Sequence, residues 1–334
     1  MRSAVIGGGS WGTALAYVLA EGGPVKMWAR EADVVEGINR DHRNPKYQKD
    51  IELPAHLEAS TDLHEALEYA ELVCVVVPSH AMRDVMGRAA AALRPGVPIV
   101  SASKGIENET LLTMDEVLTD VLPRSLRADL AFLSGPSFAR ETLQRMATAV
   151  TVAARFHDTA QRVQQAFSTD WFRVYTTEDV TGVELGGSLK NVVAIAAGVA
   201  DGLGLGHNSR AALLTRGLAE ITRLAVKRGG NPLTLSGLAG MGDLVLTCTG
   251  GLSRNRHVGV ELGRGRSLEE ILGEMDQVAE GVKTSHSAHH LALRERVEMP
   301  ITRAVYEVLY EGKSVRRMLA DLMGRELKRE RDHA

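Results

Sequence analysis

A glycine-rich turn near the N-terminus is the feature that most constrains the fold. The motif GGGSWG, from Gly7 to Gly12, directly follows the apolar run Ser3–Ile6 and opens the helical pattern Gly12–Ala20. In a dinucleotide-binding βαβ unit, the first glycine permits a tight turn and the second lets the backbone approach a pyrophosphate. The third allows the helix and strand to pack closely. The motif therefore predicts a dinucleotide at Gly7, Gly9 and Gly12; the alternative is a generic glycine turn.

Short apolar runs alternate with helical patterns through the first half of the chain. We expect strands at Ser3–Ile6, Val25–Ala29, Leu72–Val77, Pro98–Ala102, Leu130–Leu133, Ala149–Ala153 and Phe172–Tyr175. Runs of Val, Ile and Leu are typical of strands buried on both faces of a parallel sheet. Helical patterns such as Ala81–Leu93 and Thr159–Phe167 lie between them. The alternation predicts an α/β fold with a Rossmann-like, doubly wound, mostly parallel sheet, and Asn39–Asp50 is expected to form a surface loop.

The second half of the chain has a different character. Beyond about Thr177 the patterns are helical, as in Val192–Ala200 and Ala211–Lys227, and later Ser285–Arg294 and Ile301–Tyr310. We therefore expect an all-helical C-terminal domain after the Rossmann-like domain, with the division placed at residues 1–182 and 183–334.

Composition excludes several classes of protein. A net charge of −3 gives no general attraction to nucleic acid or to an anionic membrane, so any anion site must be built locally. No run of about 18 apolar residues is evident, so stable membrane insertion is not expected. Cys74 and Cys248 are too few for a disulfide framework and are expected to be reduced structural thiols. With no signal-peptide pattern, the sequence indicates a cytoplasmic protein.

Arg30 bears on the choice of cofactor. It follows the second expected strand, about 20 residues after the glycine turn, where NAD enzymes usually carry an acidic residue for the ribose 2′-hydroxyl. Arginine suits a 2′-phosphate, which favours NADP(H) over NAD(H). Glu31 is adjacent and competes for this position, and the alternative for Arg30 is a solvated surface side chain.

Two motifs stand at the expected ends of strands, where ligands bind in open α/β sheets. Lys104, in Ser101–Gly105, is expected to point toward the crevice. In the second motif, Ser134–Ala139, Gly135 exposes its backbone and Ser137 either caps a helix or contacts substrate. Each motif alone is equally compatible with a structural role.

Lys190 has the chemistry of a general base. It precedes the Ala- and Gly-rich pattern Val192–Val199, and we expect it to begin a buried helix. Burial and the positive end of the helix dipole would both favour the neutral amine. The alternative is a lysine at a domain junction whose ammonium reaches water.

A second glycine-rich region predicts an anion site. Leu238–Asp243 and Gly250-Gly251 lead into Ser253-Arg254-Asn255, which offers N–H groups, a hydroxyl, an amide and a guanidinium. The alternative is a flexible loop with surface arginines. His286 and His290 are four residues apart, but no acidic residue completes an H-E-x-x-H motif, so no metal site is expected.

Considered together, the motifs form an ordered set. It comprises Gly-x-Gly-Ser-Trp-Gly-Thr-Ala at 7–14, Asn44-Pro45-x-Tyr47, Ser103-Lys104-Gly105-Ile106-Glu107, Gly135-Pro136-Ser137-Phe138-Ala139, Glu184-Leu185 with Lys190-Asn191-Val192, Gly240-x-Gly-Asp243, Ser253-Arg254-Asn255 and Val278-x-Glu280-Gly281. From the glycine turn to about Thr284, the chain closely resembles the bacterial type of the NAD(P)-dependent glycerol-3-phosphate dehydrogenase family.

The resemblance implies a role for each matching residue. The implied cofactor-binding residues are Gly7, Gly9, Ser10, Trp11, Gly12, Arg30, Lys104, Ala139, Arg254, Val278 and Glu280. The implied substrate-binding residues are Lys104, Gly135, Ser137, Lys190, Asp243, Ser253, Arg254 and Asn255. Lys190 would be the general base, with Lys104 and Asp243 as further catalytic residues and no metal.

The implied reaction interconverts sn-glycerol 3-phosphate and dihydroxyacetone phosphate with NADP(H) preferred and NAD(H) as the second cofactor. It would supply glycerol 3-phosphate for phospholipid synthesis, and the family suggests a homodimer. Two alternatives remain: a β-hydroxyacid dehydrogenase of the same architecture, and a protein that senses NAD(P) without turnover. The first usually places Asn four residues after its catalytic Lys, where this chain has Ala194.

Overall fold

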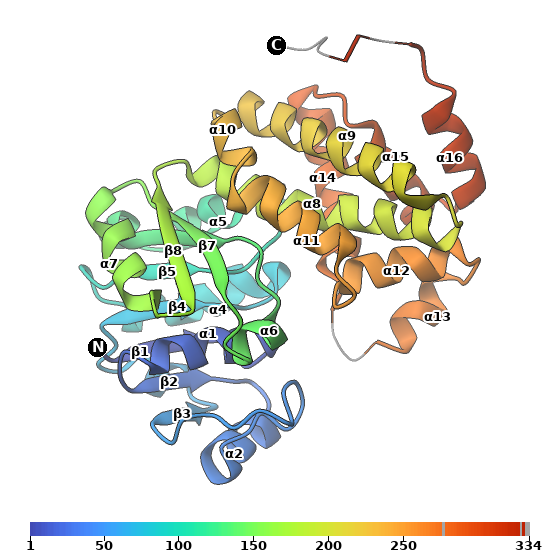
Figure 1. The fold of residues 1–334 in the computed structure, drawn as a ribbon. Coiled ribbons are helices and arrows are strands. Elements are labelled where there is room, and N and C mark those ends of the chain that lie inside the picture. The colour runs from blue at the N-terminus through green and yellow to red at the C-terminus, as the bar shows by residue number, and fades with distance from the viewer. Residues whose placement is uncertain (276–277, 328, 331–334) are drawn as a thin grey trace.

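The computed structural model describes residues 1–275, 278–327 and 329–330 and has two lobes. The lower lobe in Figure 1 holds a twisted sheet with helices on both faces, and the upper lobe is helical. The strands are β1 Ser3–Ile6, β2 Val25–Trp28, β3 Leu57–Ser60, β4 Leu72–Val75, β5 Ile99–Ser101, β6 Leu130–Ser134, β7 Thr148–Ala153 and β8 Phe172–Thr177.

The helices of the sheet lobe connect successive strands. They are α1 Ser10–Ala20, α2 Ala32–Asp41, α3 Leu63–Leu67, α4 Met82–Ala89, α5 Met114–Val121, α6 Ala139–Leu143 and α7 His157–Phe167. The helical lobe contains α8 Val180–Gly202, α9 Gly206–Lys227, α10 Pro232–Leu235, α11 Asp243–Thr249, α12 Arg254–Gly263, α13 Leu268–Gly273, α14 Glu280–Glu295, α15 Pro300–Tyr310 and α16 Val315–Met323.

Strand order confirms the predicted fold class. The described strands form one sheet in the order β3-β2-β1-β4-β5-β6-β7-β8, which begins with the 3-2-1-4-5-6 order of dinucleotide-binding folds. Strands β1 to β6 run parallel, β7 is antiparallel to β6, and β8 is parallel to β7. The order reverses between β1 and β4, so their carboxyl ends flank the crevice where ligands bind in such sheets.

One strand and part of one helix were missed in the sequence. Strand β3, Leu57-Glu58-Ala59-Ser60, pairs with β2 at the sheet edge, and its exposed Glu58 interrupts the apolar run that marked the other strands. The expected loop at Asn39–Asp50 was also too long, because α2 continues to Asp41. The difference at β3 lies at the sheet edge, where pairing with β2 outweighs a weak local pattern.

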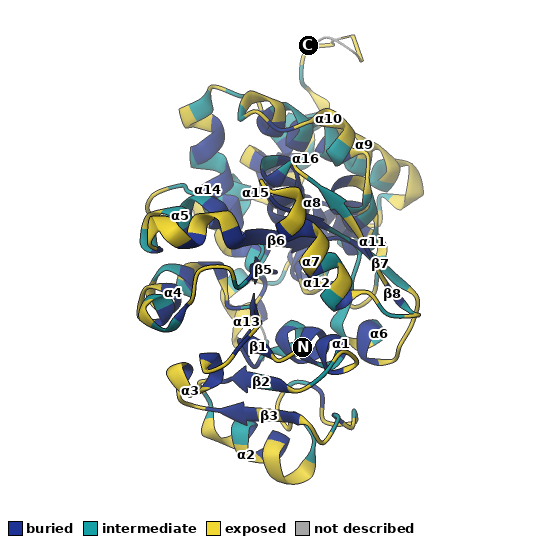
Figure 2. Ribbon diagram, turned by 90° about the vertical axis from the view of Figure 1, so that its left-hand side faces the viewer, coloured by how far each residue is buried: buried dark blue, intermediate teal, exposed yellow. Residues whose placement is uncertain are grey.

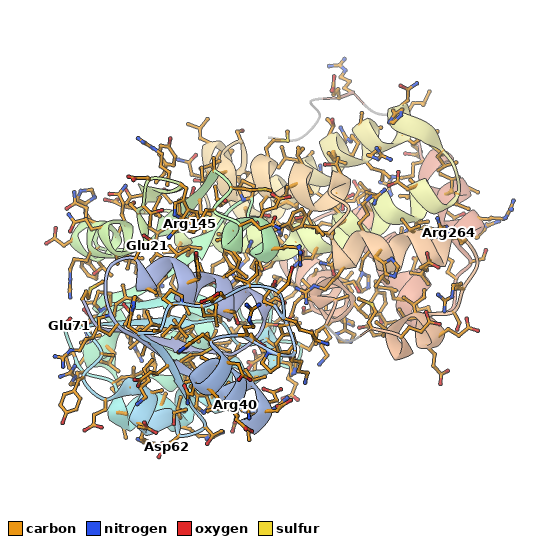
Figure 3. All side chains as sticks on the ribbon, turned by 60° about the horizontal axis from the view of Figure 1, so that its bottom comes forward. Glu21, Arg40, Asp62, Glu71, Arg145 and Arg264 are labelled. Carbon is orange, nitrogen blue, oxygen red and sulfur yellow. The ribbon has the colours of Figure 1, made fainter. Side chains whose placement is uncertain are left out.

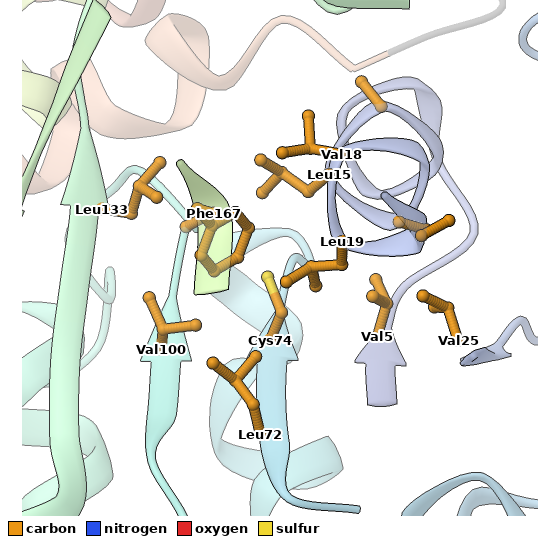
Figure 4. Close-up of a cluster of buried hydrophobic side chains, with 14 of the residues drawn as sticks. Val5, Leu15, Val18, Leu19, Val25, Leu72, Cys74, Val100, Leu133 and Phe167 are labelled. Carbon is orange, nitrogen blue, oxygen red and sulfur yellow. The ribbon is translucent and has the colours of Figure 1, made fainter. Parts of the chain in front are cut away.

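Apolar side chains fill both faces of the sheet. On the face shown in Figure 4, Leu15 and Leu19 of α1 and Phe167 of α7 lie over Val5 and Cys74 of the strands. A separate cluster that includes α4 and α5 covers the opposite face. Burial of this apolar surface holds the carboxyl ends of the strands in fixed positions.

Helix α8 is the core of the helical lobe. Nearly all of its residues are buried, and both Cys248 of α11 and Val258 of α12 belong to the same apolar cluster. In the sheet lobe, Figure 2 shows β2 in the dark blue of buried residues and α2 beside it largely in the yellow of exposed ones. α8 is also long and apolar enough to cross a membrane, and the bent pair Pro232–Thr249 and Arg254–Gly263 passes the same test when taken together. Because 94% of the apolar window in α8 is buried, its composition reflects its place in the core.

A glycine seam joins α8 to α12. We use this name for Gly198 and Gly202 of α8 together with Gly259 and Gly263 of α12. A Cβ at Gly198 would lie 2.9 Å from Gly259 Cα, and one at Gly202 would lie 2.9 Å from Gly263 Cα. The two helix backbones therefore touch along the seam.

The lobes meet where β8 leads into α8. The sheet ends at Thr177 and α8 begins at Val180, so this helix contains residue 182. The division at 182/183 stays a prediction, and residues 331–334 of the second expected domain lie outside the described residues.

Candidate active site

The glycine turn has the backbone geometry that the motif requires. Gly7 has φ +128°, and a Cβ there would lie 2.5 Å from the carbonyl oxygen of Val76. A Cβ at Gly12 would lie only 1.9 Å from the carbonyl oxygen of Gly7. Space around Gly9 is open, with no described atom within 4 Å of its Cβ position. The turn thus presents bare backbone and the N-terminus of α1 to the crevice.

Two lysines from different lobes converge on one aspartate. Lys104 follows β5 in the sheet lobe, whereas Lys190 lies on α8 and Asp243 begins α11. Lys104 Nζ lies 2.6 Å from Asp243 Oδ2, and Lys190 Nζ donates to Asp243 Oδ1. The Asp243 side chain is 1% exposed and that of Lys190 is 8% exposed. Residues far apart in the sequence therefore form one buried charged cluster at the lobe junction.

The electrostatics of this cluster suit acid–base chemistry. Burial is the main cause that lowers the pKa of Lys190 to about 7; Asp243 opposes the shift and Lys104 adds to it. Burial alone would raise the pKa of Asp243, but the two nearby ammonium groups outweigh it, so this pKa is lowered. Lys190 can therefore exchange a proton near neutral pH while Asp243 stays ionised.

The sequence predicts that Lys190 begins a helix, and this prediction is wrong. α8 starts at Val180, almost three turns earlier, so the helix dipole does not explain the low pKa. The misleading signal was the pair Gly186-Gly187. A Cβ at Gly186 would lie 2.7 Å from Ala239 O and one at Gly187 2.5 Å from Ser134 Oγ, so these glycines permit close packing within the helix.

Thr247 is a site residue that the sequence reasoning missed. Lys190 Nζ donates to Thr247 Oγ1 at 2.8 Å, and that hydroxyl donates to the Asp243 carbonyl oxygen at 2.6 Å. Thr247 lies one turn after Asp243 on α11, a helical spacing that was a usable signal. The hydroxyl orients the Lys190 amine.

Ser253, Arg254 and Asn255 form the start of α12, not a flexible loop. Ser253 caps the helix by accepting from Arg256 N at 3.2 Å. The buried Asn255 amide donates to Asn191 Oδ1 at 3.0 Å and accepts from Gly281 N at 2.9 Å. The exposed Arg254 guanidinium has no hydrogen bond or ion pair with any described residue.

Helix α14 brings Glu280 across the lobe junction. Ser79 Oγ, which follows β4, donates to Glu280 Oε2 at 3.1 Å. The pKa of Glu280 is raised, mainly by burial, although Ser79, Arg254 and Lys283 oppose the shift. Val278 is exposed just before this helix. The segment expected to hold cofactor thus lies against the carboxyl edge of the sheet.

The remaining candidate residues lie at the same edge of the sheet and differ in their hydrogen bonds and their exposure. Ser137 Oγ donates to Gly135 O at 3.0 Å, and Gly135 O also lies 3.4 Å from Lys104 Nζ. Ala139 begins α6, and Ser10 and Trp11 begin α1. Arg30 is the most exposed of the set, and its guanidinium lies 3.1 Å from Glu31 Oε1.

His286 and His290 belong to an aromatic cluster on α14 and α15. Their ring centroids are 4.3 Å apart, and His286 also contacts Tyr306 and Tyr310. Within the described residues, no group of three or more His, Cys, Asp or Glu side chains has an arrangement that holds a metal ion. Cys74 and Cys248 are both buried free thiols.

Comparison with known proteins places both lobes in one family. Residues 2–160 match the family model described as "NAD-dependent glycerol-3-phosphate dehydrogenase N-terminus", and residues 179–320 match the corresponding C-terminus. The chain is 60% identical over 331 residues to "Glycerol-3-phosphate dehydrogenase [NAD(P)+]" of Myxococcus xanthus, covering 99% of each chain. It is 56% identical to the protein of that name from Anaeromyxobacter dehalogenans over 99% of this chain and 100% of the relative.

A solved structure supports the same relationship. The crystal structure of glycerol-3-phosphate dehydrogenase from Coxiella burnetii superposes with a TM-score of 0.92 at 39% sequence identity, covering 97% of this chain and 99% of that one. The chain therefore belongs to the NAD-dependent glycerol-3-phosphate dehydrogenase family.

Proposed function

We propose that this protein is an NAD(P)-dependent dehydrogenase that interconverts sn-glycerol 3-phosphate and dihydroxyacetone phosphate. Its strongest structural support is the Lys104–Asp243–Lys190 cluster, which combines a buried amine of pKa about 7 with a second ammonium. A protein that only senses nucleotide has no need for such a cluster. The family match over both lobes, at 60% identity to a relative, decides against a β-hydroxyacid dehydrogenase.

Lys190 is the proposed general base. Its neutral amine takes the proton of the substrate C2 hydroxyl, and its ammonium returns that proton to the forming alkoxide in the reverse direction. Asp243 and Thr247 hold the amine in position. Lys104 stabilises negative charge that develops on the substrate oxygen.

The glycine turn fits a bound dinucleotide, which supplies the hydride acceptor when present. Gly9 leaves the open space that a pyrophosphate needs, Gly7 and Gly12 permit the tight turn and the close packing beneath it, and Ser10 lies at the helix N-terminus. The proposed cofactor contacts at the rim of the crevice are Trp11, Arg30, Lys104, Ala139, Arg254, Val278 and Glu280.

The proposed phosphate site is the N-terminus of α12. No described residue accepts from the backbone N–H groups of Arg254 and Asn255. The Arg254 guanidinium has no hydrogen bond or ion pair with a described residue, although it interacts electrostatically with the Glu280 carboxylate. These donors, with the helix dipole, are suited to a phosphate dianion. Ser253 and Asn255 shape the turn, and Gly135 and Ser137 complete the proposed substrate contacts.

We further propose a preference for NADP(H), a homodimer in the cytoplasm and a role in supplying glycerol 3-phosphate to phospholipid synthesis. Arg30 supports the cofactor preference, because its guanidinium is exposed at the end of β2. The proposals on assembly, compartment and role follow the family resemblance.

Arg30→Asp tests the cofactor preference. If Arg30 pairs with the 2′-phosphate, the KM for NADPH is expected to rise at least about tenfold, the scale of a lost charged hydrogen bond. The KM for NADH should stay the same or fall. Initial rates with each cofactor give the comparison, and an unchanged NADPH-to-NADH ratio would leave Arg30 with Glu31 as its only partner.

The pH profile tests Lys190 as the base. The pKa of Lys190 is lowered from 10.5 to about 7, so the amine is neutral above that pH. Oxidation of glycerol 3-phosphate needs the neutral amine, and kcat/KM is expected to rise through about pH 7 and then level off. Reduction of dihydroxyacetone phosphate needs the ammonium, so kcat/KM should fall over the same range. Initial rates at substrate concentrations well below KM, with saturating cofactor, give both profiles, and parallel profiles would contradict the assignment.

Arg254→Ala tests the phosphate site. Loss of this contact is expected to cost roughly 2–4 kcal/mol, or about 30–1,000-fold in kcat/KM for dihydroxyacetone phosphate. Unphosphorylated dihydroxyacetone does not use the contact, and its poor rate should barely change. Both are measured at saturating cofactor, because Arg254 is also a proposed nucleotide contact. Equal losses with the two substrates would place the phosphate elsewhere.

A further inference from the structure

A cavity of about 600 Å³ lies in the helical lobe, separate from the lysine cluster. Its wall is formed by the loop between α8 and α9, the first turn of α9 and the outer face of α12. Asp201 lies about 16 Å along α8 from Lys190. Neither Lys190 nor Asp243 lines the cavity. Ser253 does line it, so the cavity adjoins the proposed substrate site at this residue.

One carboxylate in the wall is shared by two guanidinium groups. Arg210 Nε donates to Asp201 Oδ1 at 3.0 Å, and Arg256 Nε donates to Asp201 Oδ2 at 2.8 Å. The Asp201 side chain is 9% exposed, so these contacts are shielded from water. Since one negative charge faces two positive charges, the trio keeps a net charge of +1. The Nη1 groups of both arginines have no partner among the described residues.

The outer part of the wall contains a second carboxylate, Glu261, and Arg264, whereas Arg266 lies outside the cavity lining. Glu261 pairs with Arg264 at 2.7 Å and, more distantly, with Arg266 at 3.5 Å. Arg264, labelled in Figure 3, lies at the surface of the helical lobe with its side chain 63% exposed. Three arginines and two acidic residues therefore line a cavity in a chain whose net charge is −3.

The N-terminus of α9 adds backbone N–H donors to the same cavity wall. Gly204 and Gly206 both line the cavity and have φ of +73° and +81°. They turn the chain into α9, a helix of 22 residues whose N-terminus has no side-chain cap. His207, in the first turn, also faces the cavity, as does His257 of α12. The positive helix end reinforces the excess of guanidinium charge.

We propose that this cavity binds a phosphate dianion, either free or as the phosphate group of a small ester. Guanidinium groups match phosphate oxygens in charge and geometry, and the spare Nη1 groups of Arg210 and Arg256 supply the donors. The volume leaves room for a small organic group beyond the phosphate.

Calorimetric titration of the full-length protein tests the proposal. Inorganic phosphate and sn-glycerol 3-phosphate are titrated separately at constant ionic strength. Arg210→Gln leaves Asp201 paired with Arg256 while it removes the excess charge. Binding at the cavity is expected to weaken about tenfold or more for both ligands, with kcat unchanged. Arg254→Ala should retain cavity binding of both ligands. Arg317→Gln, at an exposed position on α16, is the matched control and should bind as the parent protein does.

The outcomes separate this site from the substrate site. Unchanged phosphate binding in Arg210→Gln, or loss of all binding in Arg254→Ala, would overturn the proposal. Failure of inorganic phosphate to bind would overturn it too, since the phosphate group alone is the proposed determinant. If Arg210→Gln does not fold, Arg264→Gln is used, because Glu261 then keeps Arg266 as a partner. Arg264→Gln should weaken phosphate binding, and unchanged affinity would contradict the proposal.

Discussion

Lys190→Met is expected to reduce kcat by about 10²–10⁴-fold, the usual contribution of a positioned acid–base group. Methionine has a similar volume but carries no proton acceptor. Asp243 keeps Lys104 as a partner, so the substitution does not leave a buried carboxylate alone. Steady-state rates with dihydroxyacetone phosphate and NADPH give the effect, and NADPH affinity should change little.

The control for this substitution is Lys227→Met. Lys227 is an exposed lysine in the last turn of α9, far along the chain from the cluster, and its loss should leave turnover unchanged. Thermal unfolding of both variants establishes that they are folded. If Lys190→Met turned over at a near-normal rate, Lys190 would not be the base.

Gly259→Ala is expected to destabilise the protein strongly. Its Cβ would lie 2.1 Å from the Ile195 carbonyl oxygen and 2.9 Å from Gly198 Cα, both of them backbone atoms that no side-chain rotation can move. Separating α8 from α12 is expected to lower the free energy of unfolding by about 3 kcal/mol or more. For a chain of 334 residues, such a loss corresponds to a fall in Tm of roughly 4 °C or more.

Gly87→Ala is the matched comparison. Gly87 lies within α4 and is exposed, and no atom lies within 4 Å of its Cβ position. Alanine is favoured over glycine inside a helix by roughly 0.5–1 kcal/mol, so this variant should be slightly more stable. If Gly259→Ala melted at the parent temperature, the close contact of the two helices would not contribute to stability.

The fold was predictable because its strongest signals are local. The glycine turn after Ser3–Ile6 and the continuous apolar runs of the parallel strands specify a doubly wound sheet with little reference to distant residues. Strand β3 escaped notice because Glu58 breaks its apolar pattern and because pairing with β2 stabilises it. Likewise, Gly186 and Gly187 resemble helix breakers until their contacts with Ala239 and Ser134 are known.

The chemistry of the site was harder to derive from the sequence. Lys104, Lys190 and Asp243 were singled out on motifs that lie far apart, and only the fold brings their side chains into one cluster. Thr247 was missed because a lone threonine in a helical pattern carries no signal without its neighbours. Asn255 was expected to hold substrate, whereas its amide in the structure joins Asn191 to Gly281. A contact between Asn255 and substrate stays a prediction.

The ion pair between Lys104 and Asp243 makes the proton affinity of Lys190 depend on how close the two lobes are. Lys104 belongs to the sheet lobe, whereas Asp243 and Lys190 belong to the helical lobe. If the lobes separate, Lys190 loses a cationic neighbour and gains both water and undivided access to Asp243, so its pKa must rise. In that case closure would lower the proton affinity of Lys190, and by linkage a higher pH would favour the closed state. Under that condition, the neutral amine of Lys190 is more populated at neutral pH when the crevice is shut than when it is open.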